Sequence, residues 1–422
     1  MTTQEPRLSQ IPSDVLAALR IPDVRFFIAS VGLFSLANRA LLVVIGFQIY
    51  QMTKSPLALG WLGLVEAIPA ISLVLVGGYV ADHYNRRKIL IITRAASFLC
   101  AVALALLSSQ THALSLLGLY AVIFCAGIAR AFADPAGSAF EAQVVPKQLT
   151  VNGASWIGSV WISASIIGPA IIGFVFAARG AVGSYILISF WFFLAWASML
   201  FIAHKPQPKP EIKETLVKSI TIGWKFVFGN QVLLGAMALD LFAVLFGGAI
   251  ALLPIYAQDI FHVGPKGLGF LNAAPSIGAL MVMLIATRHP PIAHAGRNLL
   301  WTVTGFGISM LIFAFSKNFW LSMFALTSSG IFDGVSMVIR RSMVRLLSPD
   351  HMRGRISSVS WIFICASNEL GAFESGMVAA WIGTVPCVAA GGFVTLLVVG
   401  VTACLAPQLR RLRFDPHTLV QK

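Results

Sequence analysis

The sequence predicts an all-α membrane protein whose twelve transmembrane helices form two pseudo-symmetric six-helix bundles. Three observations support this prediction: twelve long apolar stretches, basic residues concentrated on alternate connections, and a faint internal repeat. Hydrophobic residues make up 58% of the chain and charged residues only 11%, whereas soluble domains carry about 25% charged residues. This composition excludes most soluble protein classes.

A helix needs about 20 apolar residues to cross the hydrocarbon core of a bilayer. The predicted spans are 26–50, 57–81, 89–107, 113–133, 153–177, 181–203, 231–257, 267–286, 298–315, 319–339, 356–381 and 384–405. The longest polar interruption begins at His204, contains three prolines within residues 205–210 and separates six spans from six. The expected divisions are a cytoplasmic N-terminal segment (1–25), an N-terminal bundle (26–203), a cytoplasmic linker (204–230), a C-terminal bundle (231–405) and a cytoplasmic tail (406–422).

The distribution of the 30 Lys and Arg residues predicts the orientation of the chain. We place most of them at the termini and on the even-numbered connections, and Arg39 alone inside a span. The odd-numbered connections carry Lys54, Arg179, Lys266 and Lys317. Because cytoplasmic loops are enriched in Lys and Arg, both termini are expected in the cytoplasm. The residues up to Arg25 lack the apolar run and cleavage site of a secretory signal, so the first span should remain in the mature protein.

The formal net charge of +14 does not indicate nucleic-acid binding. The basic residues are spread over many short connections between apolar helices and do not gather on one soluble domain. The five cysteines (Cys100, Cys125, Cys365, Cys387 and Cys404) form no metal-ligand or disulfide pattern and are expected to be small core residues. No metal site is expected.

Three short matches relate the two halves of the chain. Residues 63–71 resemble 269–277, residues 155–157 match 360–362, and Gly127-Ile128 matches Gly330-Ile331. The three offsets are 206, 205 and 203 residues. Matches that occur in order at nearly one offset predict a duplicated six-helix unit, which is an architecture of secondary transporters.

The connection between the second and third spans, residues 77–88, reads Gly-Gly-Tyr-Val-Ala-Asp-His-Tyr-Asn-Arg-Arg-Lys. It resembles motif A of the major facilitator superfamily, which in that family latches the cytoplasmic side during transport. In this resemblance the gating residues are Gly78, Asp82, Arg86, Arg87 and Lys88. We expect Gly78 to permit close helix approach, Asp82 to meet a helix N-terminus or an arginine, and the basic residues to anchor at the membrane surface.

Two departures from motif A and a second motif refine the resemblance. His83 replaces a common arginine, and Asn85 stands where a turn glycine is expected, although Asn tolerates positive φ. Residues 168–173, with Gly168, Pro169 and Gly173, resemble part of motif C of the facilitators, which is associated with antiport and export. This element is a candidate helix pivot or a merely structural kink. Together with residues 239–248 and 368–371, these features resemble the facilitator branch that includes the enterobactin exporter.

Ionisable residues inside a span are costly and are therefore functional candidates. The residues of this kind are Arg39, Glu66, Asp240, Asp333, Glu369 and Glu374, and we expect none in the third, sixth, ninth and twelfth spans. Arg39 and Glu66 fall at similar depths and can pair, whereas no basic residue of comparable depth is evident for Asp240. Asp240 is therefore the first candidate for proton coupling, Glu369 the second and Glu66 a third. The alternative for each carboxyl is a structural hydrogen bond to a neighbouring helix, and this is the favoured reading for Asp333 and Glu374.

Further candidates line the expected cavity and its gate. Arg130, near the cytoplasmic end of the fourth span, can pair with Asp82 or Asp134 to hold the gate. The helices that line the cavity in facilitators carry Arg39, Glu66, Trp156, Trp161, Phe242, Phe246 and Trp361, a set suited to an aromatic, amphipathic substrate.

The resemblance implies a secondary transporter of the bacterial inner membrane that exports an amphipathic small molecule, with a siderophore as the leading substrate, by proton-coupled alternating access. A broad drug or lysolipid exporter would use the same carboxyls. A sensor or scaffold without transport belongs to a different class. A membrane enzyme is not expected, because no HExxH, GxSxG or phosphate-loop pattern occurs. The expected partners are the substrate, the lipid bilayer and an outer-membrane efflux component. The expected state is a monomer that uses the proton motive force and no cofactor.

Overall fold

The computed structural model describes residues 15–109, 115–203, 216–286, 291, 293–349 and 352–414. These residues form helices and no strands. The long helices are α1 (Pro22–Thr53), α2 (Pro56–His83), α3 (Arg86–Ser109), α4 (Leu116–Val144), α5 (Thr150–Leu200), α7 (Gln231–Gly247), α9 (Gly264–Ala286), α10 (Ala295–Phe315), α11 (Phe319–Leu347), α12 (Arg353–Ile382) and α13 (Thr384–Leu405). Short elements are η2 (Ala18–Arg20), η3 (Lys147–Leu149), η4 (Ile250–Leu252), α8 (Leu253–Ile255), η5 (Tyr256–Ile260) and α14 (Pro407–Arg411).

The predicted spans correspond to helices of the structure. Eleven helical stretches of the described chain are long and apolar enough to cross a membrane. One of them contains the fifth and sixth spans, because α5 is broken at Gly180, which has the non-helical dihedrals φ 65° and ψ −163°. The seventh span is continued beyond α7 by η4, α8 and η5. Twelve crossings result, as the sequence predicts.

Helices α4 and α11 extend well beyond the ends of their predicted spans. The fourth span was expected to end at residue 133, but α4 continues to Val144. The tenth was expected to end at residue 339, but α11 continues to Leu347. Hydropathy detects where the apolar sequence stops, whereas a helix continues as long as its backbone hydrogen bonds and packing persist. Because of these extensions, arginines that the sequence places near span ends lie in the interiors of helices.

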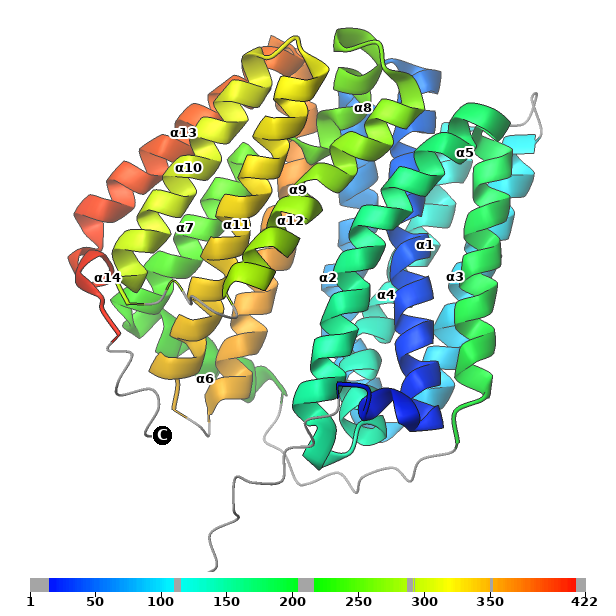
Figure 1. Ribbon diagram of the computed structural model, residues 1–422, viewed down its shortest axis with the longest axis horizontal. Coiled ribbons are helices and arrows are strands. Elements are labelled where there is room, and N and C mark those ends of the chain that lie inside the picture. The colour runs from blue at the N-terminus through cyan, green and yellow to red at the C-terminus, as the bar shows by residue number, and fades with distance from the viewer. Residues whose placement is uncertain are drawn as a thin grey trace, which may run out of the picture.

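The helices form two bundles that lie side by side (Figure 1). In the first, α1 packs on α5, and α4 packs on α2 and α3. In the second, α11 packs on α9 and α10, while α7 packs on α12 and α13. Contacts between the bundles are concentrated in two pairs of helices, α2 with α12 and α5 with α9.

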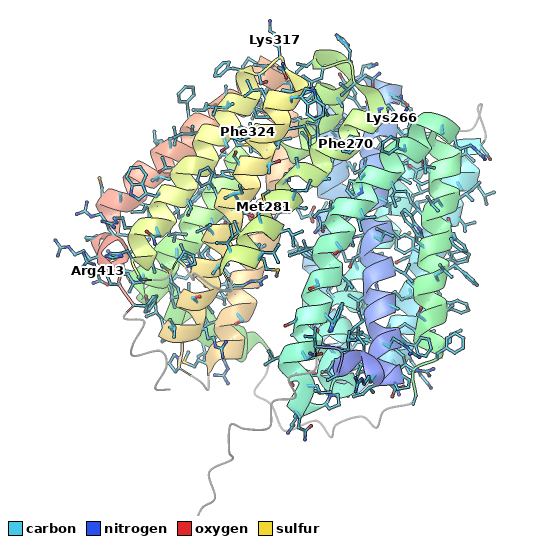
Figure 2. All side chains as sticks on the ribbon, in the orientation of Figure 1. Lys266, Phe270, Met281, Lys317, Phe324 and Arg413 are labelled. Atoms are coloured by element: carbon cyan, nitrogen blue, oxygen red, sulfur yellow. The ribbon has the colours of Figure 1, made fainter. Side chains whose placement is uncertain are left out.

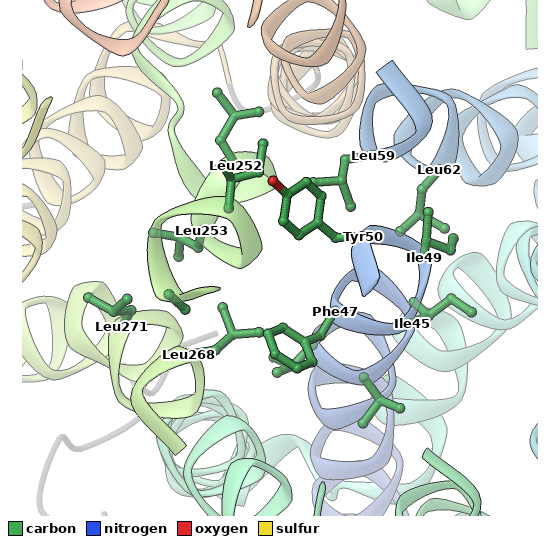
Figure 3. Packing of buried hydrophobic residues seen from close by; sticks show 14 of the residues in the cluster. Ile45, Phe47, Ile49, Tyr50, Leu59, Leu62, Leu252, Leu253, Leu268 and Leu271 are labelled. Atoms are coloured by element: carbon green, nitrogen blue, oxygen red, sulfur yellow. The ribbon is translucent and has the colours of Figure 1, made fainter. Parts of the chain in front are cut away.

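The two faces of the molecule differ in how the bundles meet. We call the face with the connections at Lys54, Gly180, His262 and Gly383 the odd-loop face, and the opposite one the basic face. Near the odd-loop face, buried residues of α1 and α2 pack against η4, α8 and α9 (Figure 3). The residues in this contact include Phe47, Tyr50, Leu59, Leu62, Leu252, Leu253, Leu268 and Leu271. The bundles are therefore closed against each other at the odd-loop face.

Packing supports the internal repeat. A Cβ on Gly127 of α4 would lie 2.7 Å from the Pro69 ring of α2. At the matching place in the second half, a Cβ on Gly330 of α11 would overlap the carbonyl group of Pro275 of α9. The residues that echo one another in the sequence thus make the same helix contact in each bundle, which is the pseudo-symmetry predicted for the fold.

Part of the predicted linker is a helix. Residues 204–215 lie outside the described residues, but Leu216–Gly229 forms α6, which packs against α12 and α7. Trp224 stacks on Phe228 and contacts Phe363 of α12, and Val227 is fully buried. The second half of the segment expected to be a linker is therefore attached to the second bundle. Residues 1–14 and 415–422 of the predicted terminal segments also lie outside the described residues.

Candidate functional site

A cluster of charged side chains joins the two bundles at the middle of the molecule. Arg130 is equidistant from the two ends of α4. Its Nη1 lies 2.7 Å from Oε1 of Glu66 on α2 and 3.5 Å from Oε1 of Glu369 on α12. Its Nε lies 3.5 Å from the carboxylate of Asp134, one turn further along α4. Of the two expected partners of Arg130, Asp134 is found and Asp82 is not.

Arg39 does not form the predicted ion pair with Glu66 in the structure. Glu66 forms its ion pair with Arg130. The Arg39 guanidinium lies over the Trp161 ring of α5, 4.9 Å from its centre. Arg39 remains close enough to Glu66, Glu369 and Arg130 to interact with each electrostatically. Arg94 of α3 interacts in the same way with Asp134. The site therefore brings three cations (Arg39, Arg94, Arg130) to three carboxyl groups (Glu66, Glu369, Asp134).

The premise that Asp240 is isolated is wrong. Asp240 of α7 is buried and forms an ion pair with Arg340 of α11, whose Nη2 also lies 3.6 Å from Asp333. Arg340 lies just beyond the predicted end of the tenth span (319–339), and hydropathy therefore does not indicate that it reaches the depth of Asp240. Asp333 contacts Arg340 of its own helix, so the structural hydrogen bond to a neighbouring helix that we favour for it stays a prediction. Glu374 lies near the odd-loop end of α12, 3.5 Å from the Ser375 hydroxyl.

Arg94 is an intramembrane charge that the sequence analysis missed. The third span was expected to carry no ionisable residue, yet Arg94 lies within α3, is buried, and places its guanidinium 3.4 Å from the centre of the Phe34 ring on α1. Arg94 falls inside the predicted span 89–107, near its basic end and shortly after the three basic residues 86–88. Arg130 and Arg340, like Arg94, lie inside helices, so Arg39 is not the single intramembrane cation.

The motif A residues form a compact arrangement at the basic face. Asp82 lies 3.6 Å from Arg86, which donates hydrogen bonds to the carbonyl oxygens of Ala81 (3.0 Å) and Ala139 (3.2 Å). Arg87 donates to the carbonyl oxygen of Leu200 at the end of α5 (2.9 Å), where the helix dipole favours a cation. The backbone N–H of Lys88 donates to the Asn85 side chain.

Two expectations for motif A are corrected. A Cβ on Gly78 would meet nothing within 4 Å, whereas one on Gly77 would overlap the backbone of Ala131 on α4. Gly77, and not Gly78, is thus the close-approach glycine. Asn85 is not among the described non-glycine residues with positive φ, which are Lys54 and His262. Instead its side chain caps the start of α3, so the missing turn glycine imposes no backbone strain.

The Gly-Pro element of the fifth span lies where α5 meets two other helices. A Cβ on Gly168 would lie 2.9 Å from the carbonyl oxygen of Leu36 on α1. One on Gly173 would lie 2.6 Å from the carbonyl oxygen of Pro265 on α9, and α9's Gly269 packs against the backbone of Pro169. Pro169 and Gly173 therefore lie at the contact between the bundles, whereas Gly168 packs within the first bundle, and the role of the three residues as a pivot stays a prediction.

The aromatic candidates are not gathered in one place. Trp161 is 46% exposed beneath Arg39, and Phe242, 41% exposed, stacks on Phe246 within α7. Trp156 lies at the basic end of α5 and donates its indole N–H to the carbonyl oxygen of Val15 (3.0 Å), so it fixes the N-terminal segment and is not a cavity residue here. The side chain of Trp361 lies outside the described ones.

Two bundles of six helices, with the pseudo-symmetry described above and an ion-pair cluster between them, define a transporter of the major facilitator type. Comparison with solved structures agrees. A peptide transporter POT mutant in complex with alafosfalin matches with a TM-score of 0.72 at 12% identity, over 95% of this chain and 100% of that one. A D-xylose–proton symporter matches with a TM-score of 0.71 at 12% identity, over 93% and 99%.

Sequence comparison gives a finer assignment. Residues 16–417 match the family described as transmembrane secretion effector, and the chain belongs to that family of the major facilitator superfamily. The chain is also 27% identical over 380 residues to the enterobactin exporter EntS of Escherichia coli O81 (strain ED1a), which covers 89% of each protein. The corresponding exporter of Escherichia fergusonii matches to the same extent. These relatives are transporters, not enzymes.

Proposed function

We propose that this protein is a secondary active exporter of an amphipathic small molecule, with a siderophore as the leading substrate, driven by inward proton movement. The observation that carries the proposal is the contact of Arg130 with Glu66 in its own bundle and with Glu369 in the other. Alternating access requires the bundles to move relative to each other. A charge contact between them is a suitable place to couple that motion to protonation.

The position of Glu369 favours it as the proton carrier. A single guanidinium, that of Arg130, is in ion-pair contact with Glu66, Asp134 and Glu369, so a proton can replace it at one of these carboxylates. Glu66 is the less suitable candidate because it is held by Arg130 at 2.7 Å, while Glu369 is 3.5 Å away and on the opposite bundle. Asp240 loses its first place because its ion pair with Arg340 lies within the second bundle and makes no contact between the bundles.

A transport cycle can be proposed from these contacts. In the described state the bundles are closed at the odd-loop face. Binding of the substrate beside Arg39 and Trp161 would permit the bundles to separate at the odd-loop face. The motif A residues, paired in the described state as Asp82 with Arg86, would latch the basic face in that second state. After the substrate has left, Glu369 would take up a proton from the odd-loop side, and it would release that proton to the basic side when the described state and its contact with Arg130 form again.

We also propose that the basic face is cytoplasmic in a bacterial inner membrane, that the protein acts as a monomer, and that an outer-membrane component receives the substrate. Orientation is testable with a membrane-impermeant thiol reagent applied to intact cells carrying Lys317→Cys or Arg413→Cys, after the native cysteines are replaced. Labelling of the first variant only is expected. Labelling of the second variant only would show that the topology is the inverse of the proposed one.

The substrate proposal is tested by mass spectrometry of cells and medium during iron starvation, with the gene deleted, restored, or restored as Glu369→Gln. Intracellular build-up of one iron-chelating compound in the deletion and in Glu369→Gln is expected. Unchanged siderophore levels would contradict the proposal. The exposed Phe242 and Trp161 would then favour the broad drug or lysolipid exporter, to be tested by efflux of those compounds. If the deletion shows the build-up but Glu369→Gln behaves as the wild type, the substrate proposal is supported and the assignment of Glu369 as the proton site is contradicted.

A further inference from the structure

A pocket lies away from the bundle interface, at the basic end of the second bundle. It encloses about 360 Å³ and is lined by His294, Arg297, Arg410, Arg411, Leu412 and Arg413. Arg413 lies at the outer edge of this bundle, far from the first bundle (Figure 2). The transport site uses none of these residues.

The pocket is built by defined packing between the start of α10 and the segment that follows α13. Leu409 of α14 is fully buried, and its carbonyl group lies where a side chain on Gly296 would be. The N–H of Gly296 donates to the carbonyl oxygen of Leu412 (3.4 Å), and the N–H of Phe414 donates to that of Ala293 (3.2 Å). The arginines between Leu409 and Phe414 are therefore held against α10 by backbone contacts on both sides.

The lining has a strong positive charge without compensation. It consists of four arginines, one histidine and one leucine, and includes no acidic residue. Within the described part of the chain, none of these arginines forms an ion pair, and all four are exposed. Guanidinium groups bind phosphate through paired N–H donors, so the chemistry of the pocket fits a phosphate group.

Apolar side chains extend from the pocket toward the membrane. On α13, Phe393, Leu397, Val401 and Leu405 recur every four residues and are 46–72% exposed, which places them on one outward stripe. On α10, Trp301 is 67% exposed one turn beyond Arg297. Helices α10, α13 and α14 pack against one another. An acyl chain would contact the side chains of this stripe, whereas a soluble phosphate compound would not.

We propose that this pocket binds the phosphate headgroup of an anionic phospholipid, with its acyl chains along the α13 stripe and against Trp301. The arginines would then sit at the membrane surface, where basic residues attract anionic lipids. Bound lipid would tie α10, α13 and α14 together at the outer side of the second bundle. This proposal does not depend on the transported substrate.

The proposal is tested by native mass spectrometry of the full chain in detergent, titrated with phosphatidylglycerol or phosphatidylcholine. The test variant is Arg297→Gln with Arg413→Gln. The control is Lys147→Gln with Lys225→Gln, which removes the same charge from exposed positions elsewhere on the basic face. Since each basic residue near the surface contributes about 1 kcal/mol, the test variant should bind phosphatidylglycerol about 30-fold more weakly. The control should bind it like the wild type, and phosphatidylcholine should bind poorly to all.

Three outcomes would overturn the proposal. Equal losses in the two variants would mean that overall charge, and not this pocket, attracts the lipid. Displacement of phosphatidylglycerol by millimolar inorganic phosphate would assign the pocket to a free phosphate compound. Failure of Arg297→Lys with Arg413→Lys to retain lipid better than the glutamine variant would mean that positive charge is not what the pocket supplies.

Discussion

At the scale of single residues, the structure contains intramembrane arginines that reduce the cost of a charge in a bilayer in two ways. Arg130 meets two glutamates and an aspartate, and Arg340 meets Asp240 and Asp333. Arg39 and Arg94 lie over aromatic rings, which attract cations through their quadrupole.

Glu369→Gln is expected to reduce proton-driven transport at least about tenfold, equivalent to about 1.4 kcal/mol, and to remove its dependence on the proton gradient. The reason is that glutamine keeps the shape of the side chain but cannot exchange a proton. Glu374→Gln, on the same helix but outside the cluster, is the control and should transport normally. The measurement is substrate flux in proteoliposomes with an imposed pH gradient. Gradient-dependent flux in Glu369→Gln would refute the assignment.

Asp240→Asn is expected to destabilise the protein by about 3–5 kcal/mol, because Arg340 would remain buried without its carboxylate. The double variant Asp240→Leu with Arg340→Met removes both charges and should recover most of that loss. Asp333→Asn, at the more exposed end of the network, should cost less. Thermal unfolding in detergent measures all three. Equal losses in the single and double variants would show that the two charges do not stabilise each other.

At the scale of helices, close approach through small residues fixes how the bundles are assembled. Without a hydrophobic driving force in lipid, helices associate through van der Waals contacts that glycine makes possible. The same Pro–Gly contact occurs between α2 and α4 and between α9 and α11. Between the bundles, Gly60 and Gly376 bring α2 against α12, and Gly173 and Gly269 bring α5 against α9.

Neighbouring glycines of motif A provide a test of this packing. Gly77→Ala should destabilise the protein by about 1–3 kcal/mol, because its new methyl group overlaps the Ala131 backbone. Gly78→Ala is the matched control and should be neutral or slightly stabilising, because the methyl group enters open space and alanine favours the helix. Thermal unfolding of the two purified variants decides between them. A larger loss at Gly78 would mean that the close contact is made in a different state of the protein.

At the scale of the whole molecule, the described state is held closed at one end by contacts that must break for the other state to form. Besides the apolar packing of Figure 3, the Tyr50 hydroxyl of α1 donates to Asp259 of η5, and Lys54 lies 3.7 Å from the same carboxylate. Both contacts cross between the bundles. They act as a polar latch at the odd-loop face.

Tyr50→Phe is expected to increase the population open at the odd-loop face about fivefold, since a half-exposed hydrogen bond to a carboxylate contributes about 1 kcal/mol. Tyr120→Phe is the control, because the Tyr120 hydroxyl donates to Ala58 within the first bundle (2.8 Å). Spin labels at Leu117→Cys and Lys317→Cys, in a background without native cysteines, report the distance across this face. Identical distance distributions in Tyr50→Phe and Tyr120→Phe would exclude the latch.

The sequence by itself determined the number of membrane crossings, the duplicated bundles and the superfamily. These properties depend on the length of apolar stretches and on local motifs, and both can be read directly from the order of the residues. Most of the charged candidates for the functional site could also be identified from the sequence, because a carboxyl group within an apolar stretch is easily recognised. Only the tertiary structure decided which charges meet. Arg130 and Arg340 looked like residues near span ends, and their depth emerged only because α4 and α11 continue past the apolar sequence. Ion pairs between helices depend on depth and rotation about each helix axis, and hydropathy specifies neither closely enough to choose Glu66 for Arg130 or Arg340 for Asp240.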